Sequence, residues 1–309
     1  MRAVRIGTRG SILALKQAEW VKERLEGSFP LLHIDLVTIK TKGDRILDAP
    51  LASIGGKGLF VKEIEVALME GKIDLAVHSM KDLPTGFPDL LHLGAVTKRE
   101  DPRDVLISKG NCPLMELREG ASVGTSSLRR QAQLLHIRPD LKITALRGNL
   151  DTRIEKLERG DLEAIVVAAA GLKRVGLEGR ITEYLLPEKF LPAIGQGALA
   201  IESRKEDQEI DEIISCIDDR ETFQCILAER ALLSRLQGGC QVPIAAFARV
   251  EDDRLSIQGL VARLDGSKIV RDEIDGAIDE SEALGTCLAE KLLEAGAKEI
   301  LEELSGGKE

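Results

Sequence analysis

The stretch Val123-Gly124-Thr125-Ser126-Ser127-Leu128-Arg129-Arg130 marks the change from a predicted strand, Ser122–Thr125, to a helix that begins at Leu128. A helix N-terminus offers unpaired N–H groups and a partial positive charge, and arginine adds a fork of donors that matches a carboxylate. This spacing predicts an α/β unit with an anion-binding turn at the end of the strand. The alternative is an ordinary serine cap followed by solvated arginines.

Two further basic turns follow predicted strands in the same part of the chain. Leu146-Arg147-Gly148-Asn149 ends a strand at Lys142–Leu146, with Arg153 one helical turn further on. Gly171-Leu172-Lys173-Arg174 follows a strand at Ala164–Ala169. The carboxyl ends of parallel strands lie at one edge of a sheet, where α/β proteins bind their ligands. We therefore expect the three turns to share one cleft and to bind a polyanion.

The alternation of strands and helices extends to both sides of this unit. The predicted N-terminal elements are strands at Ala3–Gly7, His33–Ile39 and Ile73–Val77 and helices at Ser11–Glu26 and about Leu59–Met69. This order favours an open, largely parallel sheet, which a later strand at Ala198–Ser203 could join. The central part adds a strand at Val105–Ser108 and a helix around Leu150–Glu158.

After Asp218 the pattern changes to one helix followed by alternating strands. The predicted elements are a helix at Thr222–Leu236, strands at Val242–Val250, Leu255–Arg263 and Ile269–Ile274, and a closing helix at Glu282–Leu304. The turn residues Asp252-Asp253 and Asp265-Gly266 separate the strands. This part of the chain therefore predicts an antiparallel α+β domain.

Polar turns also follow the strands of the N-terminal part. Thr8-Arg9-Gly10-Ser11 places an arginine directly after the first strand, and Ser11 is a candidate helix cap. His78-Ser79-Met80-Lys81-Asp82 follows the third strand, where a carboxylate beside a lysine can stabilise cations or move protons. Alternatively, Lys81 and Asp82 only solvate a loop, and His78 is structural. The loop Gly55-Gly56-Lys57-Gly58 lacks the spacing of a nucleotide-binding P-loop.

Cys240 lies in a glycine-flanked turn, Gly238-Gly239-Cys240-Gln241-Val242-Pro243, between a predicted helix and a predicted strand. Glycines leave such a thiol accessible, so it could act as a nucleophile or as a covalent tether. No histidine is near it in the sequence. The other cysteines have neither paired nor metal-binding spacing, so we expect no disulfide framework and no metal site; they are Cys112, Cys216, Cys225 and Cys287.

The composition argues against several classes of protein. At roughly 150 residues per domain, 309 residues correspond to two or three domains. No apolar run approaches ~18 residues, so we expect no membrane span, and the N-terminus lacks a signal-peptide pattern, which makes a cytosolic location the default. A net charge of −9 and few aromatic residues argue against nucleic-acid binding. Residues 121–180 are nevertheless net basic, as a polyanion site requires.

Taken in order, these motifs resemble the porphobilinogen deaminases, a family also called the hydroxymethylbilane synthases. The segments that carry the resemblance are Gly55–Phe60, His78–Asp82, Val123–Arg130, Leu146–Asn149, Gly195-Gln196-Gly197 and the run from Glu229-Arg230 to Gly238–Pro243. The resemblance extends from about Arg5 to the C-terminal helix. The family joins four porphobilinogen units head to tail, releasing ammonia at each step, into the linear tetrapyrrole hydroxymethylbilane for porphyrin and heme biosynthesis. Its members carry a dipyrromethane primer on a cysteine thioether.

The resemblance implies an α/β fold with two periplasmic-binding-protein-like domains around a cleft, plus a C-terminal α+β domain with a three-stranded antiparallel sheet. The implied domains are residues 1–98 with 198–217, residues 99–197, and residues 218–309, the last carrying the cofactor. The resemblance also implies a cytoplasmic, monomeric enzyme that acts on a small molecule, with no nucleic-acid, membrane or metal partner.

The same resemblance assigns roles to residues. Cys240 would carry the dipyrromethane, and Asp82 would be the catalytic carboxylate that stabilises the cationic azafulvene left when ammonia departs. Each pyrrole bears an acetate and a propionate, so basic and hydroxyl side chains would bind the growing chain. The implied cofactor-binding residues are Lys81, Asp82, Thr125, Ser127, Arg129, Arg130, Gly171, Gln196 and Cys240, and the implied substrate-binding residues are Arg9, Ser11, Lys57, Arg147, Arg153 and Arg174. Ser53 stands where family members often have a lysine, so the role of that lysine is not carried over.

Two other classes of function remain open at this point. A non-enzymatic binder of a small polyanion would keep the arginine turns but would need neither Asp82 nor Cys240. An unrelated cysteine-nucleophile transferase or hydrolase would need a general base near Cys240. The intact mass of the purified chain separates the three classes.

Overall fold

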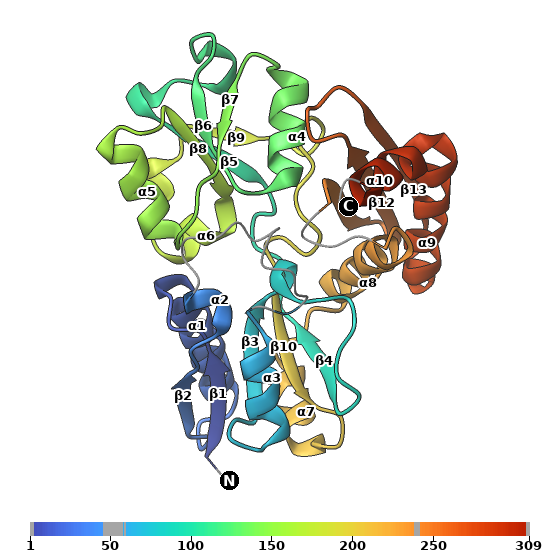
Figure 1. The fold of residues 1–309 in the computed structure, drawn as a ribbon. Helices are drawn as coiled ribbons and strands as arrows, with labels where there is room; N and C mark the ends of the chain where they lie inside the picture. The colour runs from blue at the N-terminus through green and yellow to red at the C-terminus, as the bar shows by residue number, and fades with distance from the viewer. Residues whose placement is uncertain (1–2, 46–57, 59, 238–241, 307–309) are drawn as a thin grey trace. The chain divides into compact units, whose positions relative to one another are not determined.

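The computed structural model describes residues 3–45, 58, 60–237 and 242–306, which form two compact units (Figure 1). The first unit contains the described residues up to Glu100 together with Gln196–Phe223. The second unit contains Asp101–Gly195 and the described residues from Gln224 onward.

The first unit is built on a five-stranded mixed sheet. Its strands are β1 (Val4–Thr8), β2 (Ile34–Thr38), β3 (Leu75–Ser79), β4 (Leu91–Val96) and β10 (Leu199–Arg204), in the order β2-β1-β3-β10-β4. β1 is parallel to β2 and β3, whereas β10 is antiparallel to β3 and β4. The late strand therefore joins this sheet as expected. The three predicted N-terminal strands are parallel, as expected; β10 alone runs against both of its neighbours, which makes the sheet mixed.

Helices cover both faces of this sheet. They are α1 (Ile12–Ser28), α2 (Lys42–Arg45), α3 (Lys62–Met69) and α7 (Gln208–Ser215), and a 3₁₀ turn at Met80–Asp82 follows β3. Leu75 and Val77 of β3 pack with the apolar residues of α1 and α7, whereas Ala76 packs with those of α3. Burial on both faces explains why β3 is a continuous apolar run.

The first sheet of the second unit repeats this arrangement. Its strands are β5 (Asp104–Ser108), β6 (Ser122–Gly124), β7 (Lys142–Thr144), β8 (Ala164–Ala168) and β9 (Glu183–Leu185), in the order β7-β6-β8-β5-β9. β6 is parallel to β7 and β8, and β5 is antiparallel to β8 and β9. In each sheet one strand runs antiparallel to the other four. It comes last in the sequence in the first sheet and first in the second.

The helices around this second sheet are short. They are α4 (Leu128–Ile137), α5 (Leu150–Arg159) and α6 (Ala169–Arg174), with 3₁₀ turns at Lys109–Asn111, Leu114–Glu116 and Glu178–Arg180. Each parallel strand is followed by one of these helices or by a turn that leads into it, as in other open α/β sheets.

The C-terminal part of the second unit is an antiparallel sheet with helices. Its elements are α8 (Arg220–Arg235, of which the part from Gln224 belongs to this unit), β11 (Ile244–Glu251), β12 (Arg254–Ala262), β13 (Ile269–Ala277), a 3₁₀ turn (Ile278–Glu280), α9 (Ser281–Leu292), a π-helical turn (Leu293–Ala297) and α10 (Lys298–Gly306). The prediction of one closing helix is wrong, because Gly296 adopts the left-handed conformation (φ 101°) and interrupts it. One face of this sheet forms a core with α8 and α9.

The expected fold class is confirmed, with two α/β sheets of the same strand order and a three-stranded antiparallel sheet. The sequence pattern does not predict β4 or β9; His92 and Gly94 interrupt the apolar alternation of β4. The division into three domains at the predicted boundaries stays a prediction. Within the described residues, no helix is both long and apolar enough to cross a membrane.

Candidate active site

The carboxyl edge of the first sheet gathers polar residues from three parts of the chain. The parallel strands β1 and β3 end there, and the start of antiparallel β10 lies opposite the end of β3. Arg9 follows β1, the turn with Lys81 and Asp82 follows β3, and Gln196 precedes β10. The strand order thus places four of the predicted site residues at one edge of the unit.

Lys81 and Asp82 occupy a turn that the backbone holds in place. The N–H of Met80 donates to the carbonyl of Ala198 at 3.0 Å. Lys81 Nζ donates to Oε1 of the buried Gln196 at 3.4 Å. The Asp82 side chain is exposed, and among the described residues no hydrogen bond or ion pair reaches its carboxylate. Asp82 is therefore a positioned carboxylate whose charge no described residue neutralises.

Arg9 and Ser11 lie at the start of α1. Ser11 Oγ accepts the N–H of Ala14 at 3.3 Å and caps the helix, as predicted. The Arg9 guanidinium lies over the ring of Phe60, 4.3 Å from its centroid, and this stacking orients its plane. Ser11 can still donate through its hydroxyl hydrogen while its oxygen caps the helix.

His78, which lies just before the Lys81–Asp82 turn in the sequence, forms a buried pair with Glu202 of β10. His78 Nε2 is 3.0 Å from Glu202 Oε2, and both side chains are buried. The other oxygen of Glu202 has no partner within the described part of the chain. Burial, followed by repulsion from Glu202, raises the pKa of Glu65 on α3 above its ordinary value. His78 is thus a structural residue, which was the alternative left open by the sequence.

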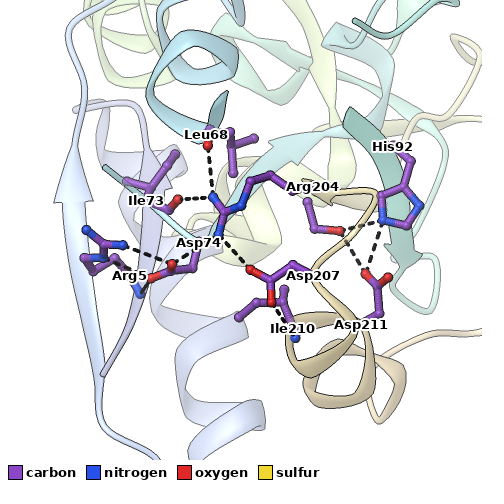
Figure 2. A network of polar contacts seen from close by, with 10 residues as sticks. Arg5, Leu68, Ile73, Asp74, His92, Arg204, Asp207, Ile210 and Asp211 are labelled. Atoms are coloured by element: carbon purple, nitrogen blue, oxygen red, sulfur yellow. Dashed lines mark hydrogen bonds and ion pairs between the residues drawn. The ribbon is translucent and has the colours of Figure 1, made fainter. Parts of the chain in front are cut away.

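The opposite edge of the same sheet carries a closed polar network (Figure 2). Asp74 accepts the backbone N–H, Nε and Nη2 of Arg5 at 2.9–3.0 Å and Nη2 of Arg204 at 3.3 Å. Arg204 also donates to the carbonyls of Leu68 and Ile73 at 2.9 and 2.8 Å. Both oxygens of the buried Asp74 carboxylate are therefore occupied by the protein itself.

A serine, a histidine and an aspartate also meet at this edge. Ser203 Oγ is 2.9 Å from His92 Nε2 and 3.1 Å from Asp211 Oδ1, and these last two atoms are 3.2 Å apart. In a nucleophilic triad the serine and the acid use opposite nitrogens of the ring. Here both use Nε2, and Ser203 is fully buried. The trio is a structural contact between β10, β4 and α7.

The carboxyl edge of the β5–β9 sheet holds the basic turns that follow β6, β7 and β8. β6, β7 and β8 end at this edge, and β5 begins there, with Asp104 opposite Ala168. The N–H of Thr125 donates to Thr144 O at 2.9 Å, and Ser126 Oγ donates to Leu146 O at 2.9 Å. The turns after β6 and β7 are thus joined, as the parallel-strand argument predicts.

Two of the hydroxyls in this turn hold the backbone. Thr125 Oγ1 accepts the N–H of Ser127 at 3.1 Å, and Ser127 Oγ accepts the N–H of Arg130 at 3.4 Å and caps α4. Thr125 is buried, Ser127 is half-buried and Ser126 is exposed. The serine-cap alternative therefore describes Ser127 correctly, and its hydroxyl hydrogen remains available for an anion.

Arg129 and Arg130 are buried and share one carboxylate. Asp104 Oδ2 accepts Arg129 Nη1 at 2.7 Å, and Asp104 Oδ1 accepts Arg130 Nε and Nη2 at 3.0 and 2.7 Å. Burial lowers the pKa of Arg129, although the charge of Asp104 opposes this shift. Arg129 Nε is buried and has no hydrogen-bond partner among the described residues. These are not the solvated arginines of the alternative prediction: the trio carries one more positive than negative charge.

The turn between β7 and α5 is held by its own cations. Arg153 Nε donates to Gly148 O at 2.9 Å, and Lys156 Nζ donates to Arg147 O at 3.2 Å. Both Arg147 and Arg153 are half-buried. The structure thus brings Arg147 and Arg153 to the same edge as Ser127.

The third basic turn lies in α6. Gly171 is buried inside this helix, and the half-buried Arg174 ends it. Lys173 Nζ is 3.3 Å from Asp101, which Arg103 also binds at 2.6 Å. Burial alone would raise the pKa of Asp101, but the hydrogen bonds from Arg103 outweigh it and hold this pKa below its ordinary value.

Two predicted site residues, Lys57 and Cys240, lie outside the described residues, as does Ser53. Of the other cysteines, Cys225 is buried, Cys112 is half-buried, and Cys216 and Cys287 are exposed. In the part of the chain that the structure describes, no group of three or more His, Cys, Asp or Glu side chains is arranged to hold a metal ion.

Sequence reasoning missed two buried carboxylates near these turns. One is Asp104. The other is Glu229 in α8, which accepts the N–H of Gly195 at 2.6 Å and that of Ala248 at 2.8 Å. The available signal was weak: Asp104 opens an apolar strand, and Glu229 interrupts the apolar face that continues at Leu232. Neither position identifies its partner without the fold.

Family models match nearly the whole chain. The model described as "Porphobilinogen deaminase, dipyromethane cofactor binding domain" matches residues 4–212, and "Porphobilinogen deaminase, C-terminal domain" matches residues 223–294. The chain is 55% identical to the porphobilinogen deaminase of Pelobacter propionicus over 303 residues, 98% of this chain and 97% of that protein. It is also 55% identical to that of Geobacter metallireducens over 303 residues, 98% of this chain and 95% of that protein.

Solved structures with a similar course of the chain include the periplasmic VFT2 domain of Bordetella pertussis BvgS. This likeness covers 70% of this chain and 86% of that one, at 14% identity and a TM-score of 0.42. On the strength of the two family models and of relatives more than half identical over almost its full length, the chain belongs to the porphobilinogen deaminase family.

Proposed function

We propose that the chain is a transferase that joins four porphobilinogen units head to tail into hydroxymethylbilane, with loss of ammonia at each step, from a dipyrromethane primer attached to Cys240. The observation that carries this proposal is the buried excess of positive charge at the start of α4. Arg129 and Arg130 share Asp104 within the region that matches the cofactor-binding family model. An uncompensated buried charge is costly, so this turn favours a further anion.

A dipyrromethane fits this donor set because its carboxylates can supply the additional negative charge that the two arginines favour. When bound, it supplies the pyrrole end to which substrate units are added. We infer that Ser127, capping α4, donates its hydroxyl hydrogen to a cofactor carboxylate and that Arg129 contributes its Nε–H, which no described residue binds. Thr125, Arg130 and Gly171 support this edge from buried positions.

In the first unit, we propose that Lys81 and Gln196 bind the cofactor and that Asp82 acts on the reacting groups. Its exposed, unneutralised carboxylate can stabilise the positive charge that develops on the substrate as ammonia leaves. It can also accept a proton from a pyrrole N–H, whose acidity rises with that charge. The hydrogen bond between Lys81 and Gln196 would hold the lysine side chain in place beside Asp82.

We propose that the remaining cations bind the acetate and propionate groups of the substrate and of the growing chain. Those residues are Arg9, Ser11, Lys57, Arg147, Arg153 and Arg174. Support comes from the basic turns at one sheet edge in each unit, since a guanidinium or ammonium pairs with a carboxylate by a charge-assisted hydrogen bond. The three-domain division, a monomeric state and a cytoplasmic location belong to the same proposal.

Intact-mass measurement tests the proposal. The purified chain should exceed its sequence mass by one dipyrromethane, and Cys240→Ser should lose both that excess and porphobilinogen turnover. The exposed Cys287 provides a matched control, since Cys287→Ser should keep the adduct and the activity.

Each alternative class has its own outcome in this measurement. A chain without added mass and without turnover, which still binds pyrrole carboxylates, would be a non-enzymatic polyanion binder. A Cys240-dependent activity without any added mass would be a different cysteine-nucleophile enzyme. An unmodified chain that polymerises porphobilinogen would refute the cofactor assignment.

A further inference from the structure

Helix α4 is shared by two parts of the second unit. Its first turn carries Ser127, Arg129 and Arg130, the proposed cofactor contacts. From Gln131 to His136 the helix lies against the C-terminal sheet and the turn between its last two strands. Arg129 and His136 are seven residues apart, which is two turns or roughly 10 Å along the axis. Whatever touches the end of this helix therefore acts on the same short rigid element as the anion-binding turn.

The turn between β12 and β13 is hydrogen-bonded to α4. His136 Nδ1 is 2.9 Å from Gly266 O, and Gln131 Nε2 donates to Leu264 O at 3.3 Å. A carbonyl oxygen only accepts, so Nδ1 is the protonated nitrogen of this histidine. Gln131 lies one turn into the helix and His136 lies near its end, and both partners are backbone atoms of one turn.

Gly266 allows this turn to approach the helix backbone closely. Its φ is +71°, and a Cβ atom at this position would lie 2.4 Å from His136 N, 2.7 Å from Leu135 C and 2.8 Å from Ala132 O. These neighbours are backbone atoms, so they cannot rotate away as a side chain would. Any larger residue here must push α4 and the turn apart.

A small apolar cluster completes the contact. It contains Ala132, Leu191, Ala245, Leu260 and Ala262, from α4, the segment after β9, β11 and β12. Successive side chains of β11 alternate between this cluster and the core under α8 and α9. The start of β11 and the end of β12 are thus buried on both faces of the sheet, which accounts for their apolar residues at adjacent positions.

Leu191 links this cluster to the cofactor-binding turn. Gln133 binds its backbone twice, accepting its N–H at 2.7 Å and donating to its carbonyl at 3.0 Å. The same carbonyl accepts Arg129 Nη1 at 2.6 Å. The orientation of the Arg129 guanidinium therefore depends on a backbone segment that the C-terminal sheet covers.

We propose that the C-terminal sheet, docked on α4, positions the cofactor-binding turn, with Gly266 and His136 as positioning residues for Ser127, Arg129 and Arg130. This inference rests on the proposed function, because it takes the first turn of α4 to be a cofactor site. Misplacing a charged donor by about 1 Å is enough to impair binding or rate strongly. The C-terminal domain thereby contributes to the site through α4 as well as through the cysteine that it carries.

Gly266→Ala tests the proposal against Gly110→Ala as a matched control. Gly110 also belongs to the second unit and has a φ of +66°, but nothing lies within 4 Å of its Cβ position. Both variants place an alanine in the left-handed region, and only Gly266→Ala collides with α4. We expect Gly266→Ala to assemble the cofactor at least 10-fold more slowly, measured by intact mass after porphobilinogen is added to the cofactor-free chain. Gly110→Ala should assemble it at the rate of the unchanged chain.

Two further variants separate positioning from stability. Ile257→Val trims the core under α8 and α9, away from α4, and should lower Tm without slowing assembly. His136→Asn keeps a donor near Nδ1 and should assemble faster than His136→Ala. Normal assembly in Gly266→Ala, or equally slow assembly in Ile257→Val at the same loss of Tm, would overturn the inference. If neither the unchanged chain nor any variant gains mass, the proposed function itself has failed.

Discussion

The two polar edges of the first sheet use similar residues in opposite ways. At the amino edge, Asp74 is 3% exposed and receives hydrogen bonds from two arginines (Figure 2). At the carboxyl edge, Asp82 is exposed and is not engaged by any described residue. A carboxylate whose acceptors are all filled by protein holds the fold together. One that the backbone positions without neutralising is ready to act on a ligand.

The largest expected effect is at the closed edge. Asp74→Asn removes the charge that Arg5 and Arg204 share, leaving two guanidinium groups without their common anion. Breaking a buried pair typically costs about 3–5 kcal/mol, so we expect a loss of this size in the free energy of unfolding by chemical denaturation. The folded fraction should keep its kcat.

The exposed ion pair between Arg254 and Asp275 is the control for that experiment. Asp275→Asn should change the free energy of unfolding far less than Asp74→Asn, because solvent screens this exposed pair. Equal losses in Asp74→Asn and Asp275→Asn would remove the distinction between the closed network and an ordinary surface pair.

At the open edge we expect Asp82→Asn to lower kcat about 100- to 1,000-fold, or roughly 3–4 kcal/mol. The loss should appear in kcat because the positive charge on the substrate exists mainly along the reaction path. Stability should stay unchanged, since no described residue depends on this carboxylate. Asp82→Glu should keep partial activity. Steady-state kinetics with mass spectrometry of enzyme–substrate complexes measures both; a near-normal kcat with weaker binding would make Asp82 a binding residue.

Two arginines of the second unit, one half-buried and one buried, provide a further comparison of binding with stability. Arg147→Leu should lower kcat/KM about 10- to 100-fold, as expected for one hydrogen bond to a charged group of about 1.5–3 kcal/mol. Arg129→Leu should impair cofactor binding and also stability, by about 1–3 kcal/mol, because Asp104 and Leu191 O lose a donor. Thermal unfolding and kinetics of both variants check this. A stable, fully active Arg147→Leu variant would contradict the substrate-binding role of Arg147 and would show that its turn is only a solvated loop.

The smallest effect concerns Glu65, whose pKa is raised by burial and by Glu202. A carboxyl whose folded-state pKa lies above its unfolded value of 4.5 destabilises the fold progressively as the pH rises through the interval between the two values. Glu65→Gln should therefore raise Tm slightly at neutral pH and leave it unchanged below pH 4.5. A gain that persists at low pH would point to packing rather than charge.

Much of the fold could be predicted from the pattern of apolar residues alone. Ser11 and Ser127 cap the helices that they were expected to cap, and β10 joins the first sheet. The missed elements have local causes: β4 contains polar and glycine positions, and Gly296 interrupts the closing helix. Local sequence carries little information about such irregular positions, because tertiary packing selects their conformation.

By itself, the sequence determined which residue types follow which strands: Arg9, Lys81 and Asp82 in one unit, and Ser127 and Arg147 in the other. Because parallel strands end at one edge, that order already implies shared binding edges.

Only the tertiary structure decided which of these charges are neutralised. Asp104 and Arg129 are 25 residues apart, and Asp74 and Arg204 are 130 apart, yet each pair is in contact. No local pattern identifies such partners, because they meet through strand order and burial. A buried charge must find a partner wherever the fold brings one, whereas an exposed carboxylate such as Asp82 stays available because water solvates it.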